Sequence, residues 1–319
     1  RVLEAVREVT SDITLLVSPQ GLKSQEFAVH LAPALRGEQV IDSMQMPRSG
    51  LLRGSLDMIR SVRQSVRSTR ADHLLLPSAD YVAQAVGMAS LAFYCPFPRS
   101  LHAEGLLTNL SFVYPGAKRK VPHQLIIAGL QRSPWTRLHV IDLLAYQWLK
   151  NNVPHLAQRF SLIPDPVEAF EPLSKPVARR ALGLPEDGRL LVCPGILIRR
   201  KGIDLLLEAF LSARSAPTDR VLLAGPLGAD VSAILQDPRY ASLVREDKIL
   251  VIDKCLNVEE LGKVLCAGDI TACPYPQQWH PSSIAIKSLA CQRPVLGADS
   301  FWLGRMIPAF EMGWTVPVH

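Results

Sequence analysis

Short apolar runs alternate with amphipathic helical patterns through the second half of the chain, and this alternation limits its fold most. Five runs rich in Leu or β-branched residues end in turn residues, as strands do: residues 189–195, 220–225, 248–253, 270–275 and 293–299. Residues 202–214 carry the apolar stripe of a helix on a sheet. Strands that are apolar on both faces predict a parallel sheet with helices on each side.

The first half repeats this rhythm less regularly. Strands are expected at residues 13–19, 39–44, 73–78, 125–129, 138–142 and 160–164. Helices are expected at residues 24–35, 51–70, 80–92 and 143–152. The uncharged stretch 81–97 is shorter than a bilayer requires and indicates a buried helix, while residues 96–122 are expected to be rich in loops.

Four prolines fall within residues 164–176, which predicts a linker without regular structure. The sequence therefore predicts two Rossmann-like, doubly wound α/β domains, one at residues 1–172 and the other at residues 173–319. We expect them to face a cleft at the carboxyl ends of their strands, where open α/β sheets bind ligands.

Composition narrows the function classes. The net charge of +6 comes from a mild excess spread along the chain rather than from a basic tail, so no nucleic-acid partner is expected. The six cysteines form no C-x-x-C pair and no zinc pattern with the histidines, which indicates buried thiols and no metal site. No signal peptide opens the sequence, so a cytoplasmic location is the default expectation.

Three protein classes build two such domains: nucleotide-sugar transferases, periplasmic-type binding proteins and two-domain dehydrogenases. The missing signal peptide disfavours the second class. The chain also contains neither G-x-G-x-x-G nor a P-loop, which disfavours the third.

A cationic corner lies where the strand at 189–195 meets the following helix. It consists of Arg199, Arg200 and Lys201. Cationic side chains and unpaired backbone N–H groups at a helix start favour a dianionic diphosphate. The alternative interpretation is a solvated helix start whose charges only aid solubility.

Four motifs agree in order with one family over residues 189–316. They read CPGILIRRKGIDLLLEAF (193–210), VLLAGP (221–226), NVEEL with AGDITACPY (257–275) and PSSIAIKSLACQRPVLG (281–297). This half resembles the donor domain of GT-B glycosyltransferases, particularly family 4. The resemblance implies metal-independent, retaining transfer of a sugar from a UDP-, GDP- or ADP-sugar substrate, with no cofactor. Lys201, with Arg200, would stabilise the leaving diphosphate.

The chain departs from the family pattern at three positions. Ile196 follows Gly195 where the family usually has Arg, and the two family glutamates fall on Trp279 and Lys287. His280 is then the candidate nearest the sugar, or an ordinary loop histidine. The expected nucleotide-pocket residues are Gly195, Arg199, Ser282, Ser283 and Lys287; the two serines alternatively serve only as helix caps.

These departures keep two other functions open. One is a GT-B-shaped binding or scaffold protein that has lost catalysis. The other is a non-transferase nucleotide-sugar enzyme, such as an epimerase, because fold does not fix function.

The first half offers weaker candidates for acceptor contacts. His102 and Glu104 are expected in a loop, where contact with a sugar or lipid-linked acceptor competes with a plain surface role. Residues 51–70 form a basic amphipathic helix that can rest on an anionic membrane, at the inner face, or be simply solvated. Residues 1–9 resemble the tail of a helix, so the sequence is expected to be a fragment.

Overall fold

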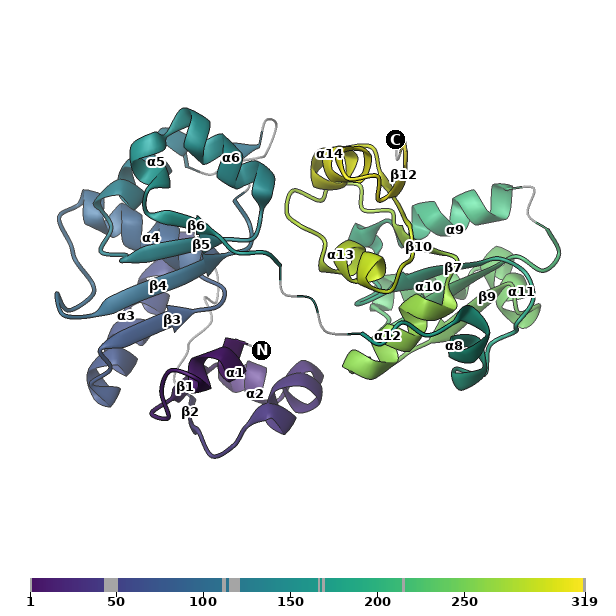
Figure 1. The fold of residues 1–319 in the computed structure, drawn as a ribbon, viewed down its shortest axis with the longest axis horizontal. Coiled ribbons are helices and arrows are strands. Elements are labelled where there is room, and N and C mark those ends of the chain that lie inside the picture. Colours follow the sequence, from purple (N-terminus) through teal and green to yellow (C-terminus); the bar gives the residue numbers. More distant parts are fainter. Residues whose placement is uncertain are drawn as a thin grey trace. The chain divides into compact units, whose positions relative to one another are not determined.

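A computed structural model of the chain describes residues 2–42, 51–110, 113–114, 121–165, 167, 170–213 and 216–317. The chain forms two compact units, unit 1 (Arg1–Pro166) and unit 2 (Val167–His319) (Figure 1). The boundary expected from sequence lies after residue 172, six residues beyond this division.

Unit 2 is built on a six-stranded parallel sheet of order β12-β11-β10-β7-β8-β9. Its strands are β7 (Leu190–Pro194), β8 (Arg220–Ala224), β9 (Ile249–Ile252), β10 (Ile270–Cys273), β11 (Val295–Ala298) and β12 (Gly313–Val316). All five strands expected in this half are confirmed. The short edge strand β12 was not predicted.

Helices cover both faces of this sheet (Figure 1). They are α8 (Lys175–Ala181), α9 (Ile203–Ser212), α10 (Ala229–Leu235), α11 (Pro238–Arg245), α12 (Val258–Ala267), α13 (Ser283–Ala290) and α14 (Phe301–Ala309). One apolar cluster joins the sheet to α8 and α12, and another joins it to α9, α10 and α11. The doubly wound α/β class is thus confirmed. The linker prediction is wrong at its end, because α8 begins at Lys175 with Pro176 in its first turn, where proline is tolerated.

The strand order creates a topological switch point in unit 2. From β7 the chain proceeds to β8 and β9 on one side, then returns to place β10 on the other side of β7. The loops after β7 and β10 therefore diverge at the carboxyl edge of the sheet, which is where open α/β sheets bind ligands.

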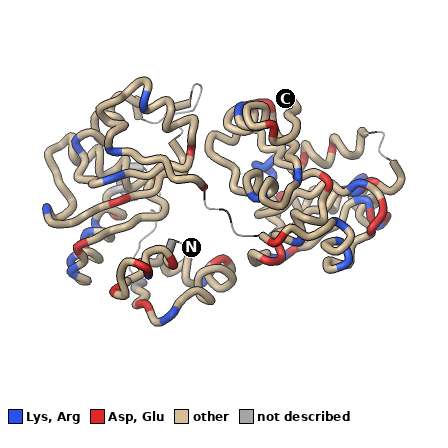
Figure 2. Tube along the Cα trace, in the orientation of Figure 1, with Lys and Arg blue, Asp and Glu red and all other residues tan. Residues whose placement is uncertain are grey.

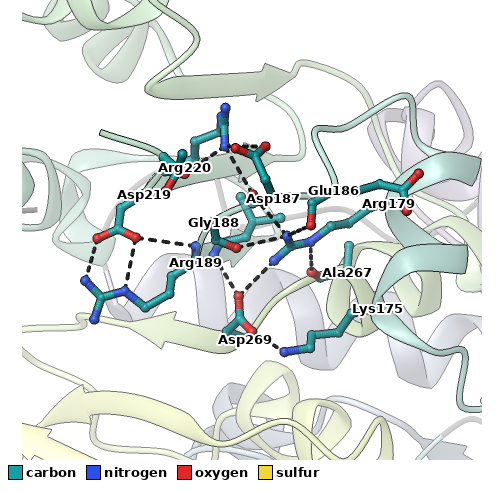
Figure 3. A network of polar contacts seen from close by, with 12 residues as sticks. Lys175, Arg179, Glu186, Asp187, Gly188, Arg189, Asp219, Arg220, Ala267 and Asp269 are labelled. Atoms are coloured by element: carbon teal, nitrogen blue, oxygen red, sulfur yellow. Dashed lines mark hydrogen bonds and ion pairs between the residues drawn. The ribbon is translucent and has the colours of Figure 1, made fainter. Parts of the chain in front are cut away.

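The opposite, amino edge of β7 and β10 is fastened by a polar cluster around Arg179 of α8 (Figure 3). Buried Arg179 donates hydrogen bonds to the carbonyls of Ala267 (3.0 Å), Glu186 (2.8 Å) and Gly188 (3.0 Å) and to Asp269 Oδ2 (2.8 Å). Asp269 Oδ2 also accepts from the backbone N–H of Leu190 at 2.8 Å. The cluster thereby ties α8 to the first residue of β7 and the start of β10.

Unit 1 contains a two-stranded parallel sheet, β1-β2, and a four-stranded parallel sheet, β3-β4-β5-β6. The strands are β1 (Thr14–Val17), β2 (Gln39–Asp42), β3 (His73–Leu76), β4 (His102–Leu107), β5 (Arg137–Val140) and β6 (Phe160–Leu162). The helices are α1 (Val2–Arg7), α2 (Pro19–Leu22), α3 (Leu51–Thr69), α4 (Asp80–Leu91), α5 (His123–Arg132), α6 (Leu143–Asn152) and α7 (Pro154–Ala157), with a π-helical turn η1 (Phe27–Leu31) and a 3₁₀ turn η2 (Ala32–Ala34).

Three expectations for unit 1 are wrong. Residues 125–129 lie in α5 rather than in a strand, because a short apolar run fits a buried helix as well as a strand. The loop-rich stretch 96–122 contains β4, whose charged and glycine residues mask its pattern. Residues 24–35 form η1 and η2 rather than one α-helix. Helix α5 packs so closely on α4 that a Cβ atom at Gly129 would lie 2.8 Å from the Gly87 carbonyl carbon.

The charges of the chain are spread over both units (Figure 2). Cys193, Cys266, Cys273 and Cys291 are buried, Cys255 is partly buried and Cys95 is exposed. None of the helices among the described residues is long and apolar enough to cross a membrane. The described part of the chain also holds no group of three or more His, Cys, Asp or Glu side chains arranged to bind a metal ion.

Candidate functional site

The turn after β7 is built from glycines that no other residue can replace without strain. Gly195 has a φ of +105° and Gly225, after β8, has a φ of +139°. A Cβ atom at Gly225 would lie 2.1 Å from the Gly195 carbonyl oxygen. The backbones after β7 and β8 can therefore approach each other this closely at the carboxyl edge of the sheet only because both positions lack a side chain.

Lys201 sits at the switch point formed by this turn. It ends a 3₁₀ turn, η4 (Arg199–Lys201), which precedes α9. A Cβ atom at Gly195 would lie 3.1 Å from Lys201 Nζ, so the ammonium occupies the space above the glycine. The next residue, Gly202, has a φ of +73°, and a Cβ atom there would lie 2.0 Å from the Pro274 carbonyl oxygen after β10.

The surroundings of the Lys201 ammonium are neutral. Its Nζ lies 5.7 Å from the centroid of the buried Tyr275 ring, which hydrogen-bonds to the Cys273 thiol. Burial raises the pKa of Cys193 to about 12 and that of Cys273 to about 11, so both thiols stay protonated near neutral pH. Burial, and to a lesser degree the charge of Arg200, lowers the pKa of Lys201.

Among the described residues, no carboxylate pairs with Lys201, because the nearby ionisable groups are Cys193, Cys273 and Arg200. A partly buried cation without an anionic partner is unfavourable. An anionic ligand that reaches the carboxyl ends of β7 and β10 would relieve that cost.

The start of α13 also lies next to Lys201 and the β7 turn. Ser282 is the buried N-cap of α13, and its Oγ accepts the backbone N–H of Ala285 at 3.3 Å. Cγ1 and Cδ1 of Ile284 would lie 3.9 Å from a Cβ atom at Gly195, so this helix start reaches the β7 turn. Ser283 is exposed, and Lys287 is half-buried one turn further along. The capping role expected for Ser282 is confirmed.

The three cations of the cationic corner have different surroundings. Arg199 is exposed, and its Nε donates to Asp204 Oδ2 on the first turn of α9 at 2.8 Å. Arg200 is exposed but close enough for its charge to lower the pKa of Lys201. The contact expected between Arg199 and the nucleotide stays a prediction.

His280 lies in the loop between β10 and α13, held against the buried Gln278. Its Nδ1 is 2.9 Å from Gln278 Nε2 and 3.1 Å from the Pro281 carbonyl oxygen. When Nδ1 accepts from the Gln278 amide, the ring hydrogen resides on Nε2 and can be donated to a ligand hydroxyl. The loop position expected for His280 is confirmed, whereas its ligand role stays a prediction.

The two candidates of unit 1 lie in strand β4, not in a loop. The His102 ring stacks on His73 with centroids 5.0 Å apart. Glu104 Oε2 lies 2.9 Å from His139 Nε2, whose other ring nitrogen lies 2.6 Å from Ser161 Oγ. These contacts cross the face of the four-stranded sheet and give each side chain a structural partner within unit 1.

Sequence reasoning missed Tyr275 and the two thiols as neighbours of Lys201. Each follows or ends a strand at the switch point, so strand order would have identified them. The order of β7 and β10 in the sheet is not encoded in any local pattern.

Two curated relatives match the chain. It is 30% identical over 138 residues to D-inositol 3-phosphate glycosyltransferase of Mycolicibacterium smegmatis, covering 41% of this chain and 30% of that protein. It is 25% identical over 248 residues to D-inositol 3-phosphate glycosyltransferase 1 of Catenulispora acidiphila, covering 70% of this chain and 55% of that protein. The chain thus spans less than two thirds of each relative. No protein-family model matches it.

Superposition on solved structures identifies the fold of the chain. Sucrose-phosphate synthase from Thermosynechococcus elongatus superposes with a TM-score of 0.70 at 17% identity, covering 99% of this chain and 78% of that chain. HepE of Anabaena in complex with UDP-glucose superposes with a TM-score of 0.65 at 13% identity, covering 99% and 80%. The chain has the GT-B fold. It resembles the GT-B glycosyltransferases of family 4 and diverges from them in sequence, as its motifs predict.

Proposed function

We propose that this GT-B chain is a glycosyltransferase that moves a sugar from a nucleoside-diphosphate sugar to an acceptor hydroxyl. The observation that carries the proposal is the Lys201 ammonium, which lies above Gly195 at the switch point and pairs with no carboxylate of the described residues. The relatives named as D-inositol 3-phosphate glycosyltransferases and the neighbour that binds UDP-glucose support the same reaction class.

In the proposed reaction, the bond between the anomeric carbon and the diphosphate oxygen breaks while the acceptor oxygen bonds to that carbon and passes its proton to the leaving diphosphate. Negative charge grows on the leaving diphosphate. Lys201 and Arg200 stabilise that charge more in the transition state than in the ground state, which is what accelerates the step. We propose retention of configuration and metal independence, as the family resemblance implies.

The remaining candidates are assigned around this centre. His280 lies nearest the sugar, while Gly195, Ser282, Ser283 and Lys287 line the nucleotide pocket. Arg199 can line the nucleotide pocket only if its guanidinium breaks the hydrogen bond to Asp204. The acceptor is a glycan or a lipid-linked sugar.

The test is turnover of UDP-, GDP- and ADP-sugars by the wild-type chain and by Lys201→Ala. We expect the substitution to lower kcat/KM by at least ~30-fold, about 2 kcal/mol of lost transition-state stabilisation. Lys263→Ala is the matched control, because Lys263 pairs with Glu259 on α12. Unchanged turnover in Lys201→Ala would remove the residue from the mechanism. Binding of a nucleotide without turnover of any sugar would favour the catalytically inactive binding protein.

We also propose that the protein works in the cytoplasm and touches the inner face of the membrane through unit 1. The buried thiols suit a reducing compartment. Helix α3 buries Ile59, Val62 and Val66, while Arg60 and Arg67 are exposed on its other side. Leu56 of α3 and Phe93 are the exposed apolar residues near these arginines, and basic residues beside exposed apolar ones suit an anionic lipid surface.

A further inference from the structure

Two buried cysteines lie next to each other in unit 2, away from the Lys201 site. Cys266 is in the last turn of α12, and Cys291 directly follows α13. Both side chains are fully buried in the same apolar cluster, and the two thiols are hydrogen-bonded to each other. Because α12 leads into the start of β10 and α13 into the start of β11, the pair lies at the amino edge of the sheet. Lys201 lies at the opposite, carboxyl edge.

The segment before α8 lies over Cys266. Residues 170–173 have neither helical nor strand structure. Phe170 packs so closely on α12 that a Cβ atom at Gly262 would lie 2.7 Å from its Cδ1 atom. One turn further along α12, the backbone N–H of Leu173 donates to the Cys266 sulfur. Residues 170–173 thus form a strap along α12 that covers this sulfur.

The surroundings of the pair favour a thiolate on Cys266. Arg293 Nη2 donates to the carbonyl oxygens of Cys266 at 2.9 Å and of Leu173 at 3.4 Å. The hydrogen bond from Cys291, together with the Leu173 N–H and the charge of Arg293, lowers the pKa of Cys266. The hydrogen bond to Cys266 and burial raise the pKa of Cys291. A thiolate is the nucleophilic form of cysteine, and a neighbouring thiol can resolve its oxidised product.

A second set of buried thiols in unit 2 has the opposite environment. Burial is the largest influence on Cys193 and Cys273, and it raises their pKa values to about 12 and about 11. Both thiols therefore stay protonated near neutral pH, the form that reacts slowly. These two cysteines are an internal control for Cys266 and Cys291, because all four are buried in one unit.

We propose that Cys266 and Cys291 form a redox-active pair that a hydroperoxide oxidises to a disulfide. The Cys266 thiolate attacks a peroxide oxygen and becomes a sulfenic acid, and hydrogen peroxide leaves as hydroxide. The Cys291 sulfur then displaces the sulfenic hydroxyl as the S–S bond forms, and its proton leaves with that hydroxyl as water. The two sulfurs lose two electrons, which reduce the peroxide. This pair acts independently of the proposed function.

The strap controls access to the pair. Because it covers the Cys266 sulfur, the oxidant reaches that sulfur when residues 170–173 open locally, as a segment without regular structure can do. Disulfide formation removes the negative charge that accepts the Leu173 N–H and attracts Arg293. Oxidation therefore weakens the attachment of the strap to α12.

The test is disulfide mapping on the wild-type chain. Exposed thiols are blocked with N-ethylmaleimide, the folded protein is treated with hydrogen peroxide and then with catalase, and the denatured protein is alkylated. Trypsin with Asp-N then separates Cys266 from Cys273 by cleavage before Asp269. We expect peptides linked through Cys266 and Cys291, and dithiothreitol should release them. Absence of this linkage, or equal oxidation of Cys193 and Cys273, would overturn the proposal.

A variant without the resolving thiol identifies the cysteine that reacts first. In Cys291→Ser the sulfenic acid on Cys266 cannot form the disulfide, so it should persist and react with dimedone. In Cys266→Ser, Cys291 should remain unlabelled, because its raised pKa keeps it protonated. Dimedone on neither cysteine in these variants would contradict the proposed order of steps.

A third variant tests the strap without changing either sulfur. Phe170→Ala removes the ring that packs on Gly262, so the strap should open more often and disulfide formation should accelerate about threefold or more. Phe210→Ala is the matched control, because Phe210 packs on the other apolar cluster of unit 2, and it should leave the rate unchanged. An unchanged rate in Phe170→Ala, or equal acceleration in both variants, would contradict control by the strap.

Discussion

At the residue scale, the role proposed for the charge of Lys201 predicts a pH limit on activity. Burial, with help from Arg200, lowers its pKa, so the ammonium loses its proton below the ordinary lysine value of about 10.4. We expect kcat/KM to fall on the alkaline side at that lowered pKa, because only the charged form stabilises the leaving diphosphate. The pH–rate profile measures this limb.

Two variants check the assignment of that limb. Arg200→Gln removes a charge that lowers the pKa of Lys201, so the alkaline limb should move to higher pH even if the maximal rate drops. Lys201→Arg should abolish the limb, since guanidinium stays charged. A limb that stays in place in both variants belongs to another group.

The lowered pKa of Lys201 also affects stability. It makes the free energy of unfolding rise with pH between the lowered pKa and about 10.4, where the unfolded chain binds more protons than the folded chain.

At the element scale, the buried Arg179 guanidinium adds a polar anchor to the apolar cluster that joins α8 to the sheet. Replacing Arg179 by Met removes its hydrogen bonds to four backbone carbonyls, those of Ala267, Glu186, Asp187 and Gly188, and its ion pair with Asp269. We expect a loss of about 3 kcal/mol in the free energy of unfolding, measured by urea denaturation. Arg180→Met is the neighbouring control. Its exposed side chain pairs only with Glu186 in the described structure, so its effect should stay within about 0.5 kcal/mol. Similar losses in both variants would contradict the role given to Arg179.

At the scale of the whole molecule, the proposed membrane contact of unit 1 can be tested on its exposed residues. Phe93 is 98% exposed at the end of α4, near the Arg63 guanidinium that contacts Tyr94. We expect sedimentation with phosphatidylglycerol vesicles and little with phosphatidylcholine vesicles. Replacing Arg60, Arg63 and Arg67 by Gln should reduce the bound fraction severalfold, and Phe93→Ser should reduce it further. Equal binding to both vesicles, or by all variants, would contradict membrane contact.

Sequence predicts most elements of this molecule, because their patterns are local. The start of α13 at Ser282 and the helical stripe after Gly202 agree with the structure. The failures concern tertiary context. The Gly87–Gly129 contact that packs α5 on α4 cannot be read from the sequence of either helix, and neither can the ion pair between Arg199 and Asp204.

The different exposure of the six cysteines allows two of them to be labelled selectively. Two of the six lie outside the interior, Cys95 in unit 1 and Cys255 in unit 2, while the other four are buried. A maleimide dye should therefore mark one position in each half under native conditions. Energy transfer between the two dyes would then report how far apart the halves stand, with and without a nucleotide sugar.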